Sequence, residues 1–318
     1  MYTEIFKNAY KVLKTDKGYL PIRFTQKQFD YYKSLNQAME YRSRNTAGIC
    51  MDFYTDAKSI SFSYTAGCFS RRYVGFDFYE NGIFRKHIEE ALDSTHGTFN
   101  HTLERDCNKR VTVYIPNLSE VTITDLDIGN FRPVEINTKE RLLFLGDSIT
   151  QGMTTLSPSL AFTTQITNAL GAQSLNRGVG SDKYDINLLD EQDEYNPTKI
   201  FVALGINDIF SMAQPSEIEI KLNRADAYME KLRDIYKLAK VYIITPIWCL
   251  RLEEDAAFKK LFDKYSKELT KLAQKHGFIA IDGYNLVPHK TKYFQDLSVH
   301  PSDSGFNHYA DNLLNAIK

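Results

Sequence analysis

Residues 142–152 read LLFLGDSITQG, an apolar run that ends in a Gly-Asp-Ser turn. The run predicts a buried strand, and the turn places Ser148 at the carboxyl end of that strand. Open parallel sheets bind ligands at this edge, so Ser148 is well placed to act on one. Two related motifs are excluded, because a P-loop needs lysine where Met153 stands and an α/β-hydrolase elbow needs glycine where Thr150 stands. The segment alone also fits an ordinary turn in which Ser148 caps a helix.

The chain after residue 140 alternates short apolar runs with longer helical patterns. This alternation predicts an α/β fold, a parallel sheet of five strands with helices on both faces. The expected strands are 141–145, 173–176, 199–204, 241–245 and 278–281, and the expected helices are 159–170, 216–238, 253–276 and 304–317. Gly171 and Gly277 stand just past helix ends, where a left-handed residue is favoured.

The earlier part of the chain has an apolar period of two. Ile60, Phe62 and Tyr64 alternate with polar residues, and turn signals such as Asn81-Gly82 separate the runs. From about residue 48 to 133 this pattern predicts an antiparallel, jelly-roll-like β-sandwich. Before it we expect one or two strands and a short helix near residues 26–35.

We expect two domains, divided by the polar stretch at residues 133–139. The sandwich is expected to span residues 1–136 and the catalytic domain residues 137–318.

Composition excludes several classes of function. The chain has 39 Lys+Arg and 40 Asp+Glu, a net charge of −1, which argues against nucleic acid as the main partner. The longest strongly apolar stretch, residues 241–250, is too short to span a membrane. No basic segment precedes an apolar core at the N-terminus, so we expect a cytoplasmic protein. A homodimer is the expectation from base rates.

The cysteines show no metal-binding or disulfide pattern. Cys50, Cys68, Cys107 and Cys249 are widely spaced, with no Cys/His ligand motif. We expect buried thiols, and neither a metal nor an organic cofactor.

Three further segments are expected at the same sheet edge as Ser148. They are NRGVGSD (176–182) after the second strand, GIND (205–208) after the third, and DLSVHP (296–301) before the last helix. With the Gly-Asp-Ser turn, this set resembles the SGNH (GDSL-type) hydrolase family, which has a flavodoxin-like sheet and a Ser, Gly, Asn and His in four sequence blocks. The resemblance covers about residues 140–318.

Chemistry gives these positions their roles. A serine hydroxyl is a weak nucleophile until a base takes its proton, and His300 is the candidate base. Attack on an ester creates an oxyanion that needs preorganised donors. The resemblance implies three: the Ser148 backbone N–H, a backbone N–H of the second block, and the Asn207 amide. The alternatives are a structural loop histidine and a turn-forming asparagine.

Two positions depart from the family pattern. Ser181 stands where the family usually has glycine, so the oxyanion donor is the Ser181 N–H or, as the next candidate, that of Gly180. The family's acid usually lies three residues before the histidine, where this chain has Leu297. Either Asp296 or a backbone carbonyl is therefore expected to orient His300.

Two nearby residues carry weaker expectations. Asp147 is expected to fix the turn by accepting hydrogen bonds from local N–H groups. Trp248 follows the fourth strand, and it either walls the substrate pocket or packs in the core.

A sandwich ahead of an SGNH domain is similar to carbohydrate acetylesterases of the family-2 type. The resemblance implies a serine esterase that removes a small acyl group, acetyl first, from a sugar or oligosaccharide ester. The alternatives are a lysophospholipase or thioesterase acting on longer acyl chains, an acyltransferase that uses the same acyl-enzyme, and a catalytically inactive glycan-binding protein.

Overall fold

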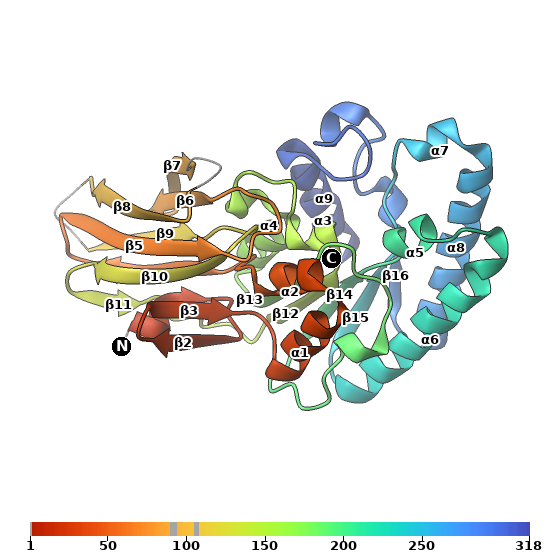
Figure 1. Cartoon of the computed structure of the whole chain (residues 1–318), viewed down its shortest axis with the longest axis horizontal. Coiled ribbons are helices and arrows are strands. Elements are labelled where there is room, and N and C mark those ends of the chain that lie inside the picture. The colour runs from red at the N-terminus through yellow and green to blue at the C-terminus, as the bar shows by residue number, and fades with distance from the viewer. Residues whose placement is uncertain (1, 90–93, 105–107) are drawn as a thin grey trace.

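In the computed structural model, which describes residues 2–89, 94–104 and 108–318, two antiparallel sheets lie beside a parallel α/β layer structure (Figure 1). The α/β fold with a preceding β-sandwich is therefore confirmed. The proposed division at residues 136 and 137 stays a prediction.

The parallel sheet has the strand order β13-β12-β14-β15-β16. Its strands are β12 (Arg141–Gly146), β13 (Gln173–Gly178), β14 (Lys199–Ala203), β15 (Lys240–Ile244) and β16 (Ile279–Ile281). All four pairings are parallel, and the order reverses at β12, which is the topological switch point of a flavodoxin-like sheet. The five strands lie where the sequence predicts them.

Two pairs of helices flank this sheet. One pair is α4 (Phe162–Ala169) with α9 (Asp303–Ala316), and the other is α6 (Ile218–Ile235) with α8 (Ala256–Lys275). The chain moves from β12 to β13 through α4, and in the opposite direction along the sheet from β14 to β16 through α6 and α8. With right-handed crossovers, these opposite directions put the two pairs on opposite faces. Three expected helices are interrupted at their first turns by η2 (Pro158–Leu160), η4 (Pro215–Glu217) and α7 (Arg251–Glu254).

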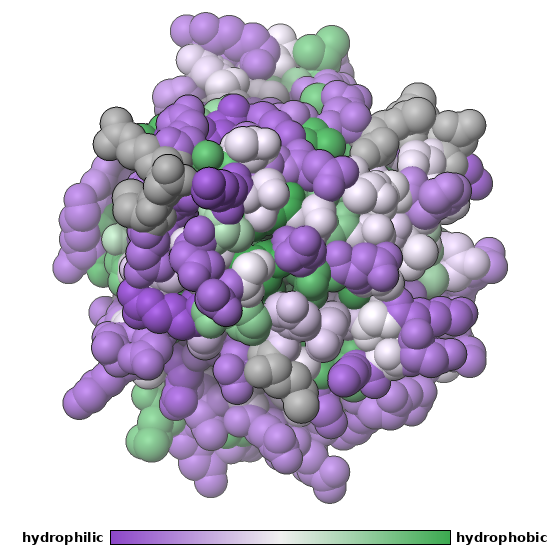
Figure 2. Space-filling view, turned by 90° about the vertical axis from the view of Figure 1, so that its left-hand side faces the viewer, coloured by the Kyte–Doolittle hydropathy of each residue, from purple (hydrophilic) through white to green (hydrophobic). Residues whose placement is uncertain are grey.

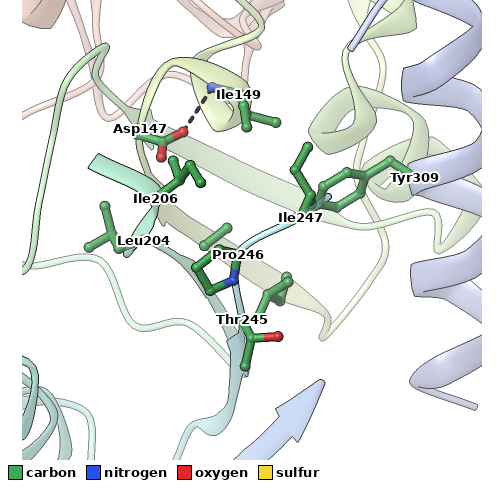
Figure 3. A pocket seen from close by; sticks show the side chains of 10 residues that line it. Asp147, Ile149, Leu204, Ile206, Thr245, Pro246, Ile247 and Tyr309 are labelled. Carbon is green, nitrogen blue, oxygen red and sulfur yellow. Dashed lines mark hydrogen bonds between the residues drawn. The ribbon is translucent and has the colours of Figure 1, made fainter. Parts of the chain in front are cut away.

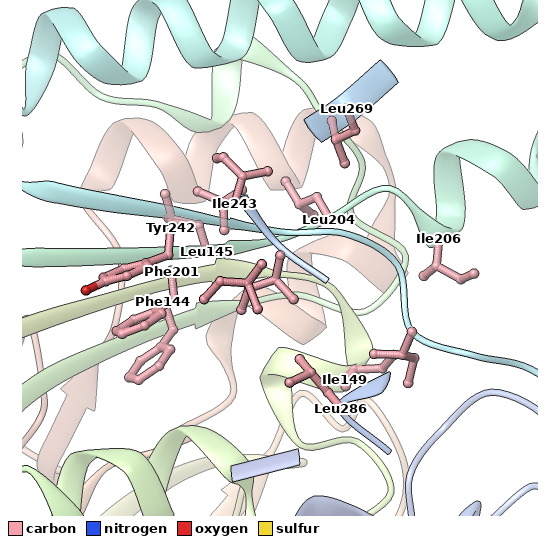
Figure 4. Packing of buried hydrophobic residues seen from close by; sticks show 14 of the residues in the cluster. Phe144, Leu145, Ile149, Phe201, Leu204, Ile206, Tyr242, Ile243, Leu269 and Leu286 are labelled. Atoms are coloured by element: carbon pink, nitrogen blue, oxygen red, sulfur yellow. The ribbon is translucent and has the colours of Figure 1, made fainter. Parts of the chain in front are cut away.

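An aromatic ladder fixes the register of the central strands. Phe144 is paired with Phe201, and Phe201 with Tyr242. The successive ring centroids are 5.1 and 5.0 Å apart, with the planes 16° and 7° from parallel (Figure 4). All three rings are buried. A slip of one residue would move a ring to the opposite face of the sheet, so the ladder holds the strand ends level.

The sandwich consists of two antiparallel sheets around a separate apolar core. One sheet has the order β1 (Phe6–Lys7), β4 (Cys50–Thr55), β9 (Lys109–Tyr114), β6 (Gly75–Glu80), β7 (Ile83–Glu89), with β11 (Phe131–Pro133) also pairing with β4. The other has the order β2 (Lys11–Thr15), β3 (Gly18–Ile22), β10 (Glu120–Asp127), β5 (Ser59–Gly67), β8 (His96–Thr102). Ile60, Phe62 and Tyr64 are buried, as their alternation predicts. Seen from the sandwich end, the surface is mostly hydrophilic, with apolar side chains near the middle (Figure 2).

The first 45 residues contain more structure than the sequence predicts. They form three strands in place of one or two, and the expected helix α1 (Gln26–Leu35) is followed by a second, α2 (Gln37–Arg44). Asn36 ends α1 in an extended conformation, and its side chain accepts the Met39 N–H to begin α2. The first strand, β1, is only two residues long, which is too short to show a period.

A buried arginine attaches these helices to the parallel sheet. Figure 1 shows α1 and α2 in front of the parallel sheet and outside the sandwich. The Arg23 side chain is fully buried between α2 and β13. It donates to the carbonyl oxygens of Asn176 (2.7 Å), Gly178 (2.9 Å), Arg42 (2.9 Å), Ser43 (3.5 Å) and Asn45 (2.6 Å). Although they precede the predicted boundary, α1 and α2 therefore belong physically to the α/β part.

Replacing this clamp is expected to destabilise the protein strongly. Arg23→Met leaves several buried carbonyl groups without donors, so the free energy of unfolding should fall by at least about 3 kcal/mol. Denaturant unfolding measures the loss, with Arg72→Met at an exposed position as the control. Equal small losses in the two variants would contradict a clamp at Arg23.

A second polar contact joins the sandwich to the loop after the nucleophile turn. Asp77 of β6 is fully buried and accepts the His87 Nδ1–H at 2.7 Å and the Ser159 N–H at 2.8 Å. Ser159 belongs to η2, on the α/β side. The hydrogen bond to Asp77 raises the pKa of His87.

This contact predicts a pH-dependent contribution to stability. The pKa of His87 is higher in the folded than in the unfolded protein, so its stabilisation is full below the unfolded pKa of about 6.5 and is lost as pH rises through the folded pKa. His87→Gln should therefore reduce the free energy of unfolding more at about pH 5.5 than at about pH 9. His96→Gln, on an exposed strand position, is the control. An equal loss at both pH values would refute the coupling.

Candidate active site

Ser148, His300 and Asp296 form a continuous relay at the carboxyl edge of the parallel sheet. Ser148 begins α3 (Ser148–Gln151), immediately beyond β12. Its Oγ lies 2.8 Å from Nε2 of His300, and Nδ1 of that ring lies 2.6 Å from Oδ2 of Asp296. When Nδ1–H donates to the carboxylate, Nε2 is left to accept the serine proton. This is the arrangement of a nucleophile, a base and an acid that orients the base.

The loop before His300 brings Asp296 to the ring although it lies four residues away. Oδ1 of Asp296 accepts the backbone N–H groups of Ser298 (2.9 Å), Val299 (2.9 Å) and His300 (3.1 Å). Leu297 takes a left-handed conformation, φ 57°, and this tightens the turn enough to accommodate the extra residue. Of the two ways to orient His300 that the sequence leaves open, the geometry favours the Asp296 side chain.

The charge of Asp296 is stabilised in this loop. Burial alone would raise the pKa of the carboxyl, but hydrogen bonds from the His300 ring and the backbone amides outweigh it and hold the pKa below its usual range. The Asp296 side chain is therefore a carboxylate at neutral pH.

Removing this charge should slow the reaction without unfolding the loop. Asp296→Asn can still accept the backbone N–H groups, but it no longer stabilises the imidazolium, so kcat should fall about 10²–10⁴-fold. Steady-state ester hydrolysis measures the effect. Asp282→Asn is a matched control, because Asp282 is an exposed aspartate that also accepts a local backbone N–H. A kcat within about threefold of wild type would contradict a catalytic role for the Asp296 carboxylate and would indicate that Ser148 and His300 act as a dyad.

The second block supplies one free backbone donor. Ser181 has φ 74°, the left-handed conformation that explains the preference for glycine at this position. The Gly180 N–H is already engaged, because it donates to Oε1 of Gln151 at 2.8 Å. Among the described residues, the N–H groups of Ser148 and Ser181 have no protein acceptor. Of the two candidates left by the sequence, Ser181 is therefore the one available to an oxyanion.

The strand before this block passes very close to the nucleophile helix. A Cβ on Gly178 would lie 2.3 Å from the backbone nitrogen of Gln151, a distance that side chains do not allow. Glycine at this position is therefore what lets β13 and α3 approach, and the approach sets the distance between the second block and Ser148.

Asn207 is held toward the nucleophile turn by two oxygens. It lies in α5 (Ile206–Phe210), and its Nδ2 is 3.1 Å from the Asp182 carbonyl oxygen and 3.4 Å from Oδ2 of Asp147. Asp147 also caps α3 by accepting the Ile149 N–H at 2.9 Å. Burial raises the pKa of Asp147 to about 7 and that of Asp208 to about 6. The Asn207 amide thus contacts the nucleophile turn through Asp147 and the second block through Asp182.

A small apolar pocket lies beside the nucleophile turn. Asp147 and Ile149, the neighbours of Ser148 in the sequence, both line it (Figure 3). The remaining lining residues come from the ends of β14 and β15 and from α9: Ala203, Leu204, Ile206, Ile244, Thr245, Pro246, Ile247 and Tyr309. The free volume of this pocket is about 20 Å³, little more than one water molecule requires.

Trp248 packs in the core beside this pocket but does not line it. The side chain is 2 % exposed, stacks on His289 and donates from Nε1 to Glu253 at 3.0 Å. Of its two alternatives, packing is the one observed, and its neighbour Ile247 lines the pocket.

Over residues 2–89, 94–104 and 108–318, no cluster of three or more His, Cys, Asp or Glu could hold a metal ion. No helix in the same ranges is long and apolar enough to cross a membrane. Cys50, Cys68 and Cys249 are free thiols, whereas Cys107 lies outside the described residues.

A match to a known protein family covers the part of the chain that carries these residues. The sequence profile of the GDSL-like lipase/acylhydrolase family matches residues 144–307, about half of the chain. The chain belongs to this family. Membership places it among the carboxylic ester hydrolases, as the four sequence blocks predict. A comparison with curated proteins finds no match.

Solved structures share the whole two-part architecture. The salicylyl-acyltransferase SsfX3 of a tetracycline biosynthetic pathway has a TM-score of 0.77 at 18% identity, over 98% of this chain and 94% of its own. A GDSL-like lipase from Bacteroides ovatus has a TM-score of 0.74 at 15% identity, over 91% of this chain and 89% of its own. A family-two carbohydrate esterase from Cellvibrio japonicus has a TM-score of 0.70 at 14% identity, over 99% of this chain and 95% of its own. At these identities the likeness shows the fold alone, and function rests on the site.

Proposed function

We propose that this GDSL-family hydrolase is a serine esterase that removes a small acyl group, acetyl first, from a carbohydrate through an acyl-enzyme on Ser148. The observation that carries the proposal is the relay from Ser148 through His300 to Asp296, with contacts of 2.8 and 2.6 Å. An ordinary helix-capping serine would not need a histidine and a carboxylate aligned behind it.

The reaction follows from this geometry. His300 Nε2 takes the proton of Ser148 Oγ as the oxygen adds to the ester carbonyl, and Asp296 stabilises the imidazolium. The oxyanion accepts hydrogen bonds from the N–H groups of Ser148 and Ser181. The Asn207 amide adds a third when it exchanges its long 3.4 Å contact with Asp147 for the oxyanion. When the intermediate collapses, the carbon–oxygen bond to the alcohol breaks, and His300 returns the proton to the leaving oxygen. Water then hydrolyses the acyl-serine by the same steps.

The size of the pocket and the structural relatives support the substrate class. The pocket beside the nucleophile turn is apolar and small, which favours a short acyl group over a long one. The relatives include a family-two carbohydrate esterase and an acetyl xylan esterase from Butyrivibrio proteoclasticus (TM-score 0.61, 14% identity). The substrate we propose is accordingly a small-molecule or oligosaccharide acyl ester. A homodimer and a cytoplasmic location remain predictions.

A second candidate activity is acyl transfer to a hydroxyl other than water. SsfX3, an acyltransferase, shares almost the full length of this chain. The same acyl-serine serves both reactions, and only the acceptor differs.

A chain-length series with p-nitrophenyl esters from acetate to octanoate tests the proposal. Acetate should be preferred, and kcat/KM should fall at least about tenfold beyond four acyl carbons, because the pocket beside the nucleophile turn is small and a longer chain has to find room outside it. Ser148→Ala should lower kcat about 10⁴–10⁶-fold. Ser34→Ala, on the exposed side of α1, should match wild type.

Each other outcome indicates a different function. A preference for octanoate would point to a lipase or thioesterase, and acylated sugar formed from added oligosaccharide would point to a transferase. Turnover that survives Ser148→Ala would contradict the mechanism, and a complete lack of turnover would favour a glycan-binding protein.

A further inference from the structure

Arg42, from the N-terminal helix α2, touches the second block at the peptide that supplies the oxyanion donor. Its Nη1 donates to the Gly180 carbonyl oxygen at 2.8 Å and to Oγ of Ser181 at 2.9 Å. The Gly180 carbonyl and the Ser181 N–H are the two ends of one peptide unit. Because that unit is planar and trans, fixing the direction of its carbonyl fixes the opposite direction of its N–H.

We propose that Arg42 is a positioning residue that aims and polarises the Ser181 N–H toward the oxyanion. The proposal rests on the esterase function above, because it concerns the donor that meets the oxyanion. A charged donor on the carbonyl draws electron density through the peptide, and this strengthens the N–H at its other end. Arg42 itself does not touch the substrate in this account.

The conformation of Ser181 explains why such support is needed. Residues other than glycine rarely adopt a positive φ, and Ser181 holds φ 74° where the family usually has glycine. The Arg42 guanidinium bonds the carbonyl just before this residue and the hydroxyl on it. The arginine therefore restrains both the peptide before the strained residue and the side chain of that residue.

The preceding peptide is held independently, which leaves Arg42 one specific task. The Gly180 N–H donates to Gln151, whose Nε2 donates to Oδ1 of Asn45 at 3.0 Å. Gln151 is fully buried in α3, directly behind the nucleophile. Fixing the Val179–Gly180 peptide does not set the plane of the next one, because Gly180 leaves two dihedral angles free between them.

Arg42 is itself held in place by the buried clamp. Its backbone oxygen accepts from Nη2 of Arg23 at 2.9 Å, and Nη1 of that guanidinium bonds the Gly178 oxygen at 2.9 Å. The turn of α2 that carries Arg42 is thus attached to the strand end that carries the second block. A segment far from the hydrolase motifs in the sequence completes their geometry.

The test compares two arginines of the same helix. Arg42→Met should lower kcat about 10–100-fold, less than or equal to the loss of an oxyanion donor, with KM changed by no more than about threefold. Arg44 is the control, because its Nε pairs with Glu120 at 2.7 Å, away from the second block. Arg44→Met should keep kcat within about twofold.

Two further variants separate the carbonyl contact from the others. Arg42→Lys retains a charged donor for the Gly180 oxygen, but on a flexible stem in place of the planar guanidinium, so it should restore part of the lost rate. Ser181→Ala removes the hydroxyl contact and keeps the backbone donor, so its loss in kcat should be smaller than that of Arg42→Met. A loss in Ser181→Ala as large as that in Arg42→Met would overturn the role of the peptide.

A boronic acid supplies a readout that a merely structural role would not move. Its tetrahedral adduct with Ser148 places an oxygen in the oxyanion position, so its Ki should rise in Arg42→Met by about the factor lost in kcat/KM. An unchanged Ki, or a kcat equal to that of Arg44→Met, would overturn the inference.

Folding and function are separated by two checks. Melting temperatures show whether each variant is folded. If Arg42→Met is not folded, Arg42→Lys decides the question. A three- to tenfold loss in kcat is expected for Arg42→Lys, and a wild-type kcat would overturn the inference. If the wild type itself shows no turnover dependent on Ser148, the proposed function fails. The Kd of the boronic acid, measured by direct binding, then still decides the inference, since equal Kd values for wild type and Arg42→Lys would overturn it.

Discussion

The parallel pairing of β12 with both β13 and β14 is the constraint on which the site depends. It brings the carboxyl ends of three strands to one edge, so that Ser148, Ser181 and Asn207 come together although they are 33 and 26 residues apart in sequence order. The aromatic ladder from Phe144 holds this register, and Gly178 allows α3 to approach its neighbour. Catalysis then needs only a base from outside the sheet, which the loop before α9 supplies in His300.

Local patterns in the sequence were sufficient to predict the sheet and most of the site. The period-two alternation of the sandwich and the strand–helix alternation of the α/β part can both be recognised from residues close together in the sequence. The four sequence blocks are found because each lies at a strand end or before the last helix. The sequence left the partner of His300 open between Asp296 and a backbone carbonyl. The Asp296 contact depends on the left-handed turn at Leu297, and leucine gives no local signal for that conformation. The break at Asn36 and the burial of Trp248 likewise depend on local capping and tertiary packing.

The contacts of Arg23, Arg42 and Gln151 lay beyond sequence reasoning for a different reason. Each of the three side chains contacts at least one residue more than 100 positions away, and no spacing rule connects such pairs. A charged residue on a short amphipathic helix ordinarily faces solvent, and nothing in the α2 sequence distinguishes Arg42 from Arg44. The structure shows that one arginine pairs with Glu120 and the other with the peptide beside the nucleophile. In this protein the N-terminal segment therefore contributes to the active site and does more than precede it.

The most direct test of the account is covalent labelling of the nucleophile. A fluorophosphonate reacts with a serine whose proton is taken by an adjacent base, and the adduct mimics the tetrahedral intermediate. Intact mass spectrometry followed by peptide mapping should find one adduct, on Ser148, formed much more slowly in His300→Ala. Labelling at another serine, or an equal rate in the His300 variant, would contradict an activated Ser148.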